Sequence, residues 1–205
     1  MSRSDDFLIE VGTEELPPKA LRSLMEAFGA NLEAGIDDAR LSHGGVRGYA
    51  SPRRLAIIVN GLAHAQEERR VEKKGPPVKV AFDADGNPTP AATAFATKCD
   101  TTVDSLDRVE TPKGEWLVFH TIDKGKTAAE LLPDIIERAL AALPIPRRMR
   151  WGAGEAEFVR PVHWIVMLHG KVVVDASVMG IAAGRESRGH RFHSSGAVTI
   201  ESPDD

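Results

Sequence analysis

The sequence predicts an α+β fold in which mainly antiparallel strands form mixed sheets with packed helices, in one or two small subdomains. Short apolar runs bounded by turn residues recur along the chain and indicate strands. Two long segments carry apolar residues at helical spacing. These strands and helices do not alternate regularly, which argues against a parallel βαβ sheet. His169-Gly170 lies between two strand-like runs and is typical of a tight antiparallel hairpin.

The N-terminal segment predicts a strand followed by a helix. Phe7–Val11 is a short apolar run, which is typical of a buried strand. Thr13 is a candidate N-cap, and Pro17-Pro18 fits the first turn or an extended entry to the helix. From Lys19 onward the apolar residues fall on one helical face, at Leu21, Leu24, Met25, Phe28 and Leu32.

The middle of the chain predicts two strands joined through SPRR, a connector and a short helix. Residues 46–50 and 54–63 are strand-like runs, and residues 67–74 are a charged connector. Residues 83–90 are dense in turn formers, which predicts a loop, and Pro90 starts a helix over 91–98. We expect any boundary between subdomains to fall near residues 75–90.

The second half carries the clearest helix and the hairpin. Thr127 and Glu130 form a capping box for a helix over Thr127–Leu143. Pro133 is expected at or near its first turn, where it need not break the helix. Residues 163–168 and 171–178 are the two predicted strands of the hairpin.

Composition excludes some classes of protein. The formal net charge of −4 is mildly acidic and does not suggest a nonspecific nucleic-acid binder. No apolar stretch is long enough to span a bilayer, so we expect a cytoplasmic protein without a membrane partner. Cys99 is the single cysteine and is interpreted as a buried structural thiol. No Cys/His spacing indicates a metal site, and neither GxxxxGK[ST] nor a GxGxxG after a strand indicates a nucleotide site.

Arginines gather toward the C-terminal side and are candidate contacts for phosphate groups. Arg147, Arg148 and Arg150 follow a stiff Pro-Ile-Pro segment and precede Trp151, which could stack on an unpaired base or pack beneath the loop. The alternative is an ordinary solvated basic face. A second group surrounds Gly189 and comprises Arg188, His190 and Arg191, which suit an anion site or a structural role at a strand end.

Arg53 and Arg54 form a third, weaker candidate group. An internal carboxylate such as Glu14 or Glu15 would explain this pair equally well. His163 lies among apolar neighbours and is interpreted as a satisfied histidine, because no Ser, Cys or paired carboxylate stands near it in sequence. Glu14 and Glu15 are adjacent and point in different directions, which makes a general acid/base pair between them improbable.

Several longer motifs resemble those of one family in order along the chain. They are EVGTEELPPKALR, SPRRLA, KGP, KGEWL, LPIPRRMRWG, FVRPVHW and RGHRF, which together extend from Phe7 to Phe192. The chain resembles the β subunit of the bacterial two-subunit glycyl–tRNA synthetase. Because the family's β chains are several times longer, the resemblance implies an N-terminal fragment that lacks the later helical and anticodon-binding regions.

The resemblance implies a role in glycine–tRNA ligase, with no independent chemistry in this fragment. The α subunit would bind ATP and Mg²⁺ and attach glycine to tRNA(Gly), while this region would bind tRNA and support assembly. The implied partners are the α subunit, tRNA(Gly) and the rest of the β subunit, in an assembly with two copies of each subunit. The alternatives are an editing-like hydrolytic domain, for which the histidines have no placed partner, and a purely structural subunit interface.

Overall fold

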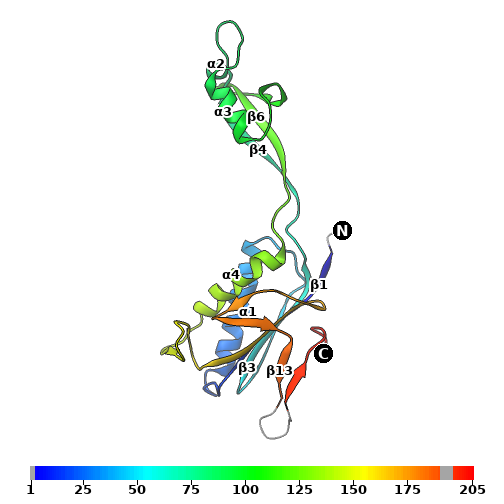
Figure 1. Cartoon of the computed structure of the whole chain (residues 1–205), viewed down its shortest axis with the longest axis vertical. Helices are drawn as coiled ribbons and strands as arrows, with labels where there is room; N and C mark the ends of the chain where they lie inside the picture. The colour runs from blue at the N-terminus through cyan, green and yellow to red at the C-terminus, as the bar shows by residue number, and fades with distance from the viewer. Residues whose placement is uncertain (1–2, 190–195) are drawn as a thin grey trace. The chain divides into compact units, whose positions relative to one another are not determined.

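A computed structural model describes residues 3–189 and 196–205 of the chain. These residues form two compact units, shown with their helices and strands in Figure 1. Unit 1 comprises Met1–Glu67 and Lys126–Asp205, and unit 2 comprises Glu68–Gly125. Each unit has its own sheet and helices, so each is described by itself.

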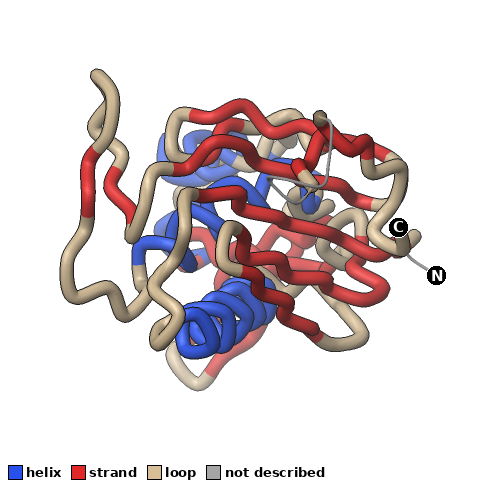
Figure 2. The backbone as a smooth tube through the Cα atoms, turned by 90° about the horizontal axis from the view of Figure 1, so that it is seen from below, coloured by secondary structure: helices blue, strands red, loops and turns tan. Residues whose placement is uncertain are grey.

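In the described residues, unit 1 contains a seven-stranded sheet with the order β11-β12-β9-β1-β3-β2 and β10 beside β9. Only β12 against β9 is parallel, so the predicted α+β fold with mainly antiparallel pairing is confirmed. Figure 2 shows strands (red) side by side. The strands of this sheet are β1 (Ser4–Thr13), β2 (Val46–Ser51), β3 (Arg54–Ala63), β9 (Val162–His169), β10 (Val172–Val173), β11 (Ser177–Val178) and β12 (Ile181–Gly184). Two separate pairs join β7 (Met149–Arg150) to β8 (Glu157–Phe158) and β13 (Glu186–Arg188) to β14 (Ala197–Thr199).

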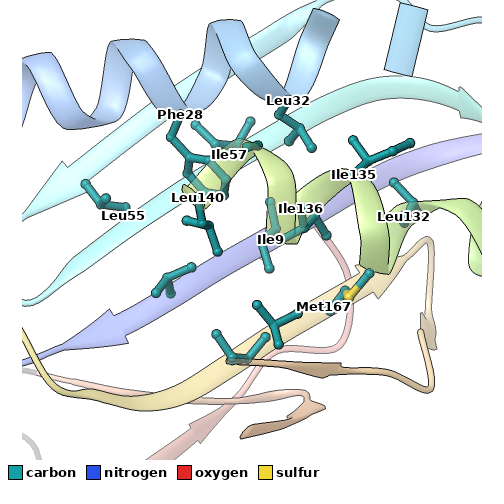
Figure 3. Close-up of a cluster of buried hydrophobic side chains, with 14 of the residues drawn as sticks. Ile9, Phe28, Leu32, Leu55, Ile57, Leu132, Ile135, Ile136, Leu140 and Met167 are labelled. Atoms are coloured by element: carbon teal, nitrogen blue, oxygen red, sulfur yellow. The ribbon is translucent and has the colours of Figure 1, made fainter. Parts of the chain in front are cut away.

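Two helices, α1 (Leu21–Asp38) and α4 (Ala128–Ala141), cover one face of the sheet. Figure 3 shows the core between them, where Phe28 and Leu32 of α1 meet side chains of α4 and of the strands. The labelled residues from α4 and the sheet are Leu132, Ile135, Ile136, Leu140, Ile9, Leu55, Ile57 and Met167. Removing this apolar surface from water is the main force that holds the helices to the sheet.

Strand β1 lies in the middle of the sheet, between β3 and β9. Because side chains alternate along a strand, Phe7, Ile9 and Val11 enter the core beneath the helices. Leu8 and Glu10 point to the other face, which we call the open face because neither α1 nor α4 covers it. Leu8 joins a smaller apolar cluster there with Trp164, Val166 and Leu168.

The start of α1 differs from the prediction. Thr13 is the last residue of β1, fully buried, and its backbone N–H donates to the Arg53 carbonyl, so it is not an N-cap. Residues 17–20 form a turn, and α1 begins at Leu21 after Ala20, whose side chain makes no capping hydrogen bond. The two prolines account for the later start, because they cannot donate backbone hydrogen bonds.

The start of α4 follows the prediction. The Thr127 hydroxyl accepts from the Glu130 N–H, and the Glu130 carboxylate accepts from the Thr127 N–H, so the capping box is present. Pro133 is the sixth residue of the helix and lies in its second turn, not its first, yet the helix continues through it to Ala141. The predicted strand over 171–178 is interrupted instead, because residues 174–176 separate β10 from β11. Gly170, with φ of 58°, makes the predicted hairpin turn before β10.

Unit 2 has a three-stranded antiparallel sheet in the order β4-β6-β5, with helices on one face. The predicted connector over 67–74 is wrong, since it lies largely in β4 and is paired along most of its length with β6. Most of its side chains are exposed, so charged residues fit an edge strand. The elements are β4 (Arg69–Pro77), α2 (Val78–Ala81), α3 (Pro90–Lys98), the 3-10 helix η1 (Val103–Ser105), β5 (Asp107–Thr111) and β6 (Gly114–Asp123).

The loop and the helix predicted in this unit are confirmed. Asp83 accepts hydrogen bonds from the backbone N–H groups of Asp85 and Asn87, which shapes the loop before α3. Cys99 is buried at the end of α3, as expected of a structural thiol. Trp116 in β6 is half-buried, with the Lys74 ammonium 4.2 Å from its ring centre.

Candidate nucleic-acid interface

A buried carboxylate organises the open face of the sheet in unit 1. Glu10 is 4 % exposed and accepts hydrogen bonds from Arg54 at 3.0 Å and from the Trp164 indole N–H at 2.7 Å. The Ser187 hydroxyl is its third donor. Burying a carboxylate is costly unless donors replace its water, so this network explains how a charged residue lies inside a central strand.

Gly12 makes room for one of these donors. A side chain built at Gly12 would place its Cβ 1.9 Å from the Trp164 ring. The ring therefore lies directly against the β1 backbone. Gly12 pairs with Trp164 on one side and with Arg54 on the other. Only glycine permits so close an approach, and the indole N–H reaches Glu10 as a result.

The structure brings two of the predicted basic residues together on this face. Arg54 donates to Glu10, to the Ser187 hydroxyl at 3.2 Å and to the Arg188 carbonyl, so it ties β13 to the sheet. Its carboxylate partner is internal, as one reading of the sequence expected, but it is Glu10 and not Glu14 or Glu15. The Arg188 side chain is exposed, with its guanidinium carbon 6.0 Å from the centre of the Trp164 ring.

Arg53 has different surroundings from its neighbour. It is half-buried, and its Nε is enclosed without a hydrogen-bond partner in the described residues. It follows Pro52, which helps to line a hollow at the corner where β1 ends. The hollow is lined by Glu14, Glu15, Leu16, Pro17, Pro18, Pro52 and Arg160.

The predicted cluster of arginines lies in residues 147–157, which we call the basic arm. This segment is coloured yellow in Figure 1. Arg147 and Arg150 are exposed, and within the described part of the chain no hydrogen bond or ion pair engages their side chains. Arg148 donates to the Ala141 carbonyl at 2.5 Å and so caps the end of α4. The structure thus leaves two of the three arginines free to meet a phosphate.

Aromatic residues anchor this arm to the core. Trp151 is half-buried and packs against the core of unit 1, as in the second of the two alternatives left open by the sequence, and this leaves less of its ring for a base. Phe158 in β8 is fully buried. Arg160 donates to the Glu15 carbonyl at 3.1 Å and contacts the Met149 sulfur at 3.3 Å, which ties the arm to the corner.

His163 has a partner that lies far from it in sequence. Its Nε2 is 2.8 Å from the Glu14 carboxylate, and both side chains are partly exposed to solvent. The expectation of a satisfied histidine near the surface is confirmed. His190 and Arg191, the remaining candidates around Gly189, lie outside the described residues.

Sequence reasoning missed two members of this open face. Glu10 stands alone as a charge in the apolar run FLIEV, which is the signal that could have predicted a polar network on the second face. Ser187 carried no signal in the sequence. It lies 177 positions after Glu10, and only the fold brings the two side chains together.

Two further features bear on the kind of site. In residues 3–189 and 196–205, no cluster of three or more His, Cys, Asp and Glu side chains is arranged to hold a metal ion. Across the same residues, no helix has the length and apolar character required to traverse a lipid bilayer.

Comparison with known proteins identifies the family. A family model described as "Glycyl-tRNA synthetase beta subunit" matches residues 7–205. The chain is 52 % identical over 202 residues to the glycine--tRNA ligase beta subunit of Marinobacter nauticus, covering 98 % of this chain and 29 % of the relative. It is 52 % identical to that of Hahella chejuensis and 50 % identical to that of Escherichia coli, each over 198 residues, with 97 % of this chain and 29 % of the relative covered.

These matches define the class of protein as a subunit of an aminoacyl-tRNA synthetase, a ligase component. The chain belongs to the glycyl-tRNA synthetase beta subunit family. It spans about 29 % of the length of the curated relatives that it matches. The resemblance inferred from the motifs is therefore confirmed.

Proposed function

We propose that this chain is a non-catalytic region of glycine–tRNA ligase that binds tRNA(Gly) and supports assembly with the α subunit in the cytoplasm. In this proposal the α subunit holds ATP and Mg²⁺ and attaches glycine, and this chain alone is inactive. Family membership supports the connection to glycyl-tRNA synthesis. The observation that carries the RNA contact is the pair of free, exposed arginines on the basic arm.

Arg147 and Arg150 suit this role for electrostatic and geometric reasons. Guanidinium groups form paired hydrogen bonds with phosphate oxygens, and neither group is already occupied by a carboxylate in the described residues. The arm that carries them is anchored by Phe158, so binding does not have to order a loose segment. Arg53, Arg54, Arg148, Trp151, Arg188, His190 and Arg191 remain candidate contacts.

A salt series tests the proposal. Binding of tRNA(Gly) to this chain is measured between roughly 50 and 200 mM salt, where the release of counterions from the RNA makes binding depend strongly on salt. The R147A/R150A double variant is expected to bind more weakly and to lower the salt slope by about 2, because each lost phosphate contact contributes about 1. The α subunit is added or omitted in parallel.

R22A is the matched control, because Arg22 is an exposed arginine on α1 that pairs with Glu26. It should leave the slope unchanged. Equal affinity and slope for wild type and the double variant would remove the arm from the RNA contact. Binding to the α subunit without any RNA binding would contradict the tRNA-binding part of the proposal and leave a structural subunit interface.

A further inference from the structure

Strand β2 lies at the edge of the unit 1 sheet and presents side chains on the open face. It pairs only with β3, with Tyr49 opposite Ala56 and Arg47 opposite Ile58. The alternation of side chains therefore places Tyr49 and Arg47 on one face. Gly48 between them points to the other face, where a Cβ would lie 2.9 Å from Met25 of α1.

Tyr49 is an aromatic residue with little packing around it. It is 50 % exposed, and it is the only aromatic among the large, strongly exposed apolar side chains of the described residues. Its partner across the strands, Ala56, offers only a methyl group. No hydrogen bond engages the Tyr49 hydroxyl within the part of the chain described, whereas a tyrosine built into a core usually has a partner for it.

Two arginines neighbour this ring in the β2–β3 ladder. Arg47 lies two residues away on the same strand and face, exposed and without an ion-pair partner in the described residues. Arg54 lies diagonally across the ladder, because it precedes Ala56 by two residues on β3. The open face has one buried carboxylate in this region, Glu10, and Arg54 already neutralises it.

We propose that this part of the open face binds an unpaired segment of RNA, with Tyr49 stacking on a base and Arg47 contacting the backbone; this rests on the proposed function. An exposed aromatic ring flanked by arginines on a strand is the arrangement that holds single-stranded RNA on a sheet. The positive charge of the exposed Arg47 favours a negatively charged ligand, as the phosphodiester backbone of RNA is. A protein partner needs a larger apolar area, whereas β2 offers on this face only Arg47 and Ser51 beside the single ring.

The experiment compares wild type with Y49A, Y49F and R47A in this chain. The probes are a 10-nucleotide unstructured RNA, an RNA duplex of the same composition, and tRNA(Gly), with the RNA length being roughly the span of a single-strand site. Y49A is expected to weaken binding of the single strand about fivefold or more, and Y49F to restore it, because stacking needs the ring and not the hydroxyl. R47A should lower the salt slope by about 1.

A spectroscopic signal reports stacking directly. The chain has one tyrosine, so ring-labelled tyrosine gives a single set of resonances from Tyr49. Adding the single-stranded RNA is expected to move these resonances upfield, which a purely structural tyrosine would not show. V172A is the matched control, because Val172 is 63 % exposed on β10, and it should bind like wild type.

Each remaining outcome overturns the inference. If the wild type binds single-stranded RNA, Y49A binds it equally well and the tyrosine signals do not move, the proposed function stands and the stacking site is wrong. If the wild type binds no RNA, both fail. If Y49A weakens binding to the α subunit and leaves RNA binding intact, the strand is a protein interface.

Discussion

His169 shows how a single residue makes stability depend on pH. It is 6 % exposed, its Nε2 contacts the Leu62 carbonyl at 2.9 Å, and its ring stacks on that of His64 at 4.1 Å. Burial lowers the pKa of His169 from its ordinary value of 6.5, with the hydrogen bond to Leu62 acting in the opposite direction. His64 in turn contacts the Asp5 carboxylate at 2.7 Å, and this hydrogen bond lowers the pKa of Asp5.

We predict that His169 destabilises the folded chain as the pH falls below about 6.5. Below that value the unfolded chain binds a proton that the buried imidazole resists, so the folded state loses relative stability until the pH reaches the lower pKa of the folded form. H169Q keeps a donor for Leu62 and removes this titration. The difference in unfolding free energy between wild type and H169Q should change by up to about 1.4 kcal/mol per pH unit.

Denaturant titrations at several pH values check this, with H163Q as the control because His163 is exposed and lies beside Glu14. Parallel pH profiles for wild type and H169Q would show that the buried imidazole does not carry the effect. A difference seen equally in H163Q would assign it to histidines in general.

At the scale of elements, the boundaries of α4 come from local hydrogen bonds. The Thr127 hydroxyl accepts from the Glu130 backbone N–H. The hydroxyl and the backbone N–H of Thr127 both donate to the Glu130 carboxylate, and these two bonds lower the pKa of Glu130. Thr127 also forms an isolated antiparallel β-bridge with Ala65 just before the helix begins. A local signal of this kind is independent of the rest of the fold, which is why the sequence predicted it.

T127A should therefore lower the free energy of unfolding by about 1 kcal/mol, since an alanine N-cap leaves the first N–H groups of α4 without a side-chain acceptor. Ser23 provides a control in α1 of the same unit, where its hydroxyl bonds the Ala20 carbonyl and caps no N–H group. S23A is expected to change stability by less than about 0.5 kcal/mol. Equal effects of the two substitutions in chemical denaturation would contradict a specific capping role.

Elements with strong local signals were predicted, and those that depend on distant partners were not. The apolar run Leu55–Val59 and the turn residues after Ser51 are local signals, so β2 and β3 were predictable as strands. Residues 69–74 look like a charged linker, and only pairing with β6 makes them a strand. The same distinction holds for the candidate site. The clustering of arginines in the sequence indicates Arg147 and Arg150, whereas the contact of Arg54 with Glu10 and that of His163 with Glu14 arise from tertiary structure.

At the scale of the whole molecule, unit 2 is an insertion between two neighbouring points of unit 1. The backbone N–H of Gln66 donates to the Lys126 carbonyl at 3.0 Å, and the Gln66 side chain accepts from the Lys126 N–H at 2.9 Å. Ala128 donates to the His64 carbonyl just beyond. The entry and exit of unit 2 are thus joined by hydrogen bonds that belong to unit 1.

We predict that unit 1 folds when residues 68–125 are replaced by a two-glycine link, because the ends to be joined are already adjacent. The shortened chain should show cooperative unfolding by circular dichroism and should keep the fluorescence of buried Trp164. As a control, replacing residues 152–155 in the basic arm with the same link should also preserve folding. A shortened chain that remains unfolded would show that unit 1 depends on unit 2.

The central place of β1 has a consequence for the protein during its synthesis. Strand β3 can pair with β1 early, but β9, the partner on the other side, is made about 100 residues later. At about 5–20 residues per second, this central strand of the sheet keeps one bare edge for about 5–20 s on the ribosome. Such an edge can recruit a strand from another nascent chain, so the interval before β9 emerges is when the newborn protein most needs a chaperone.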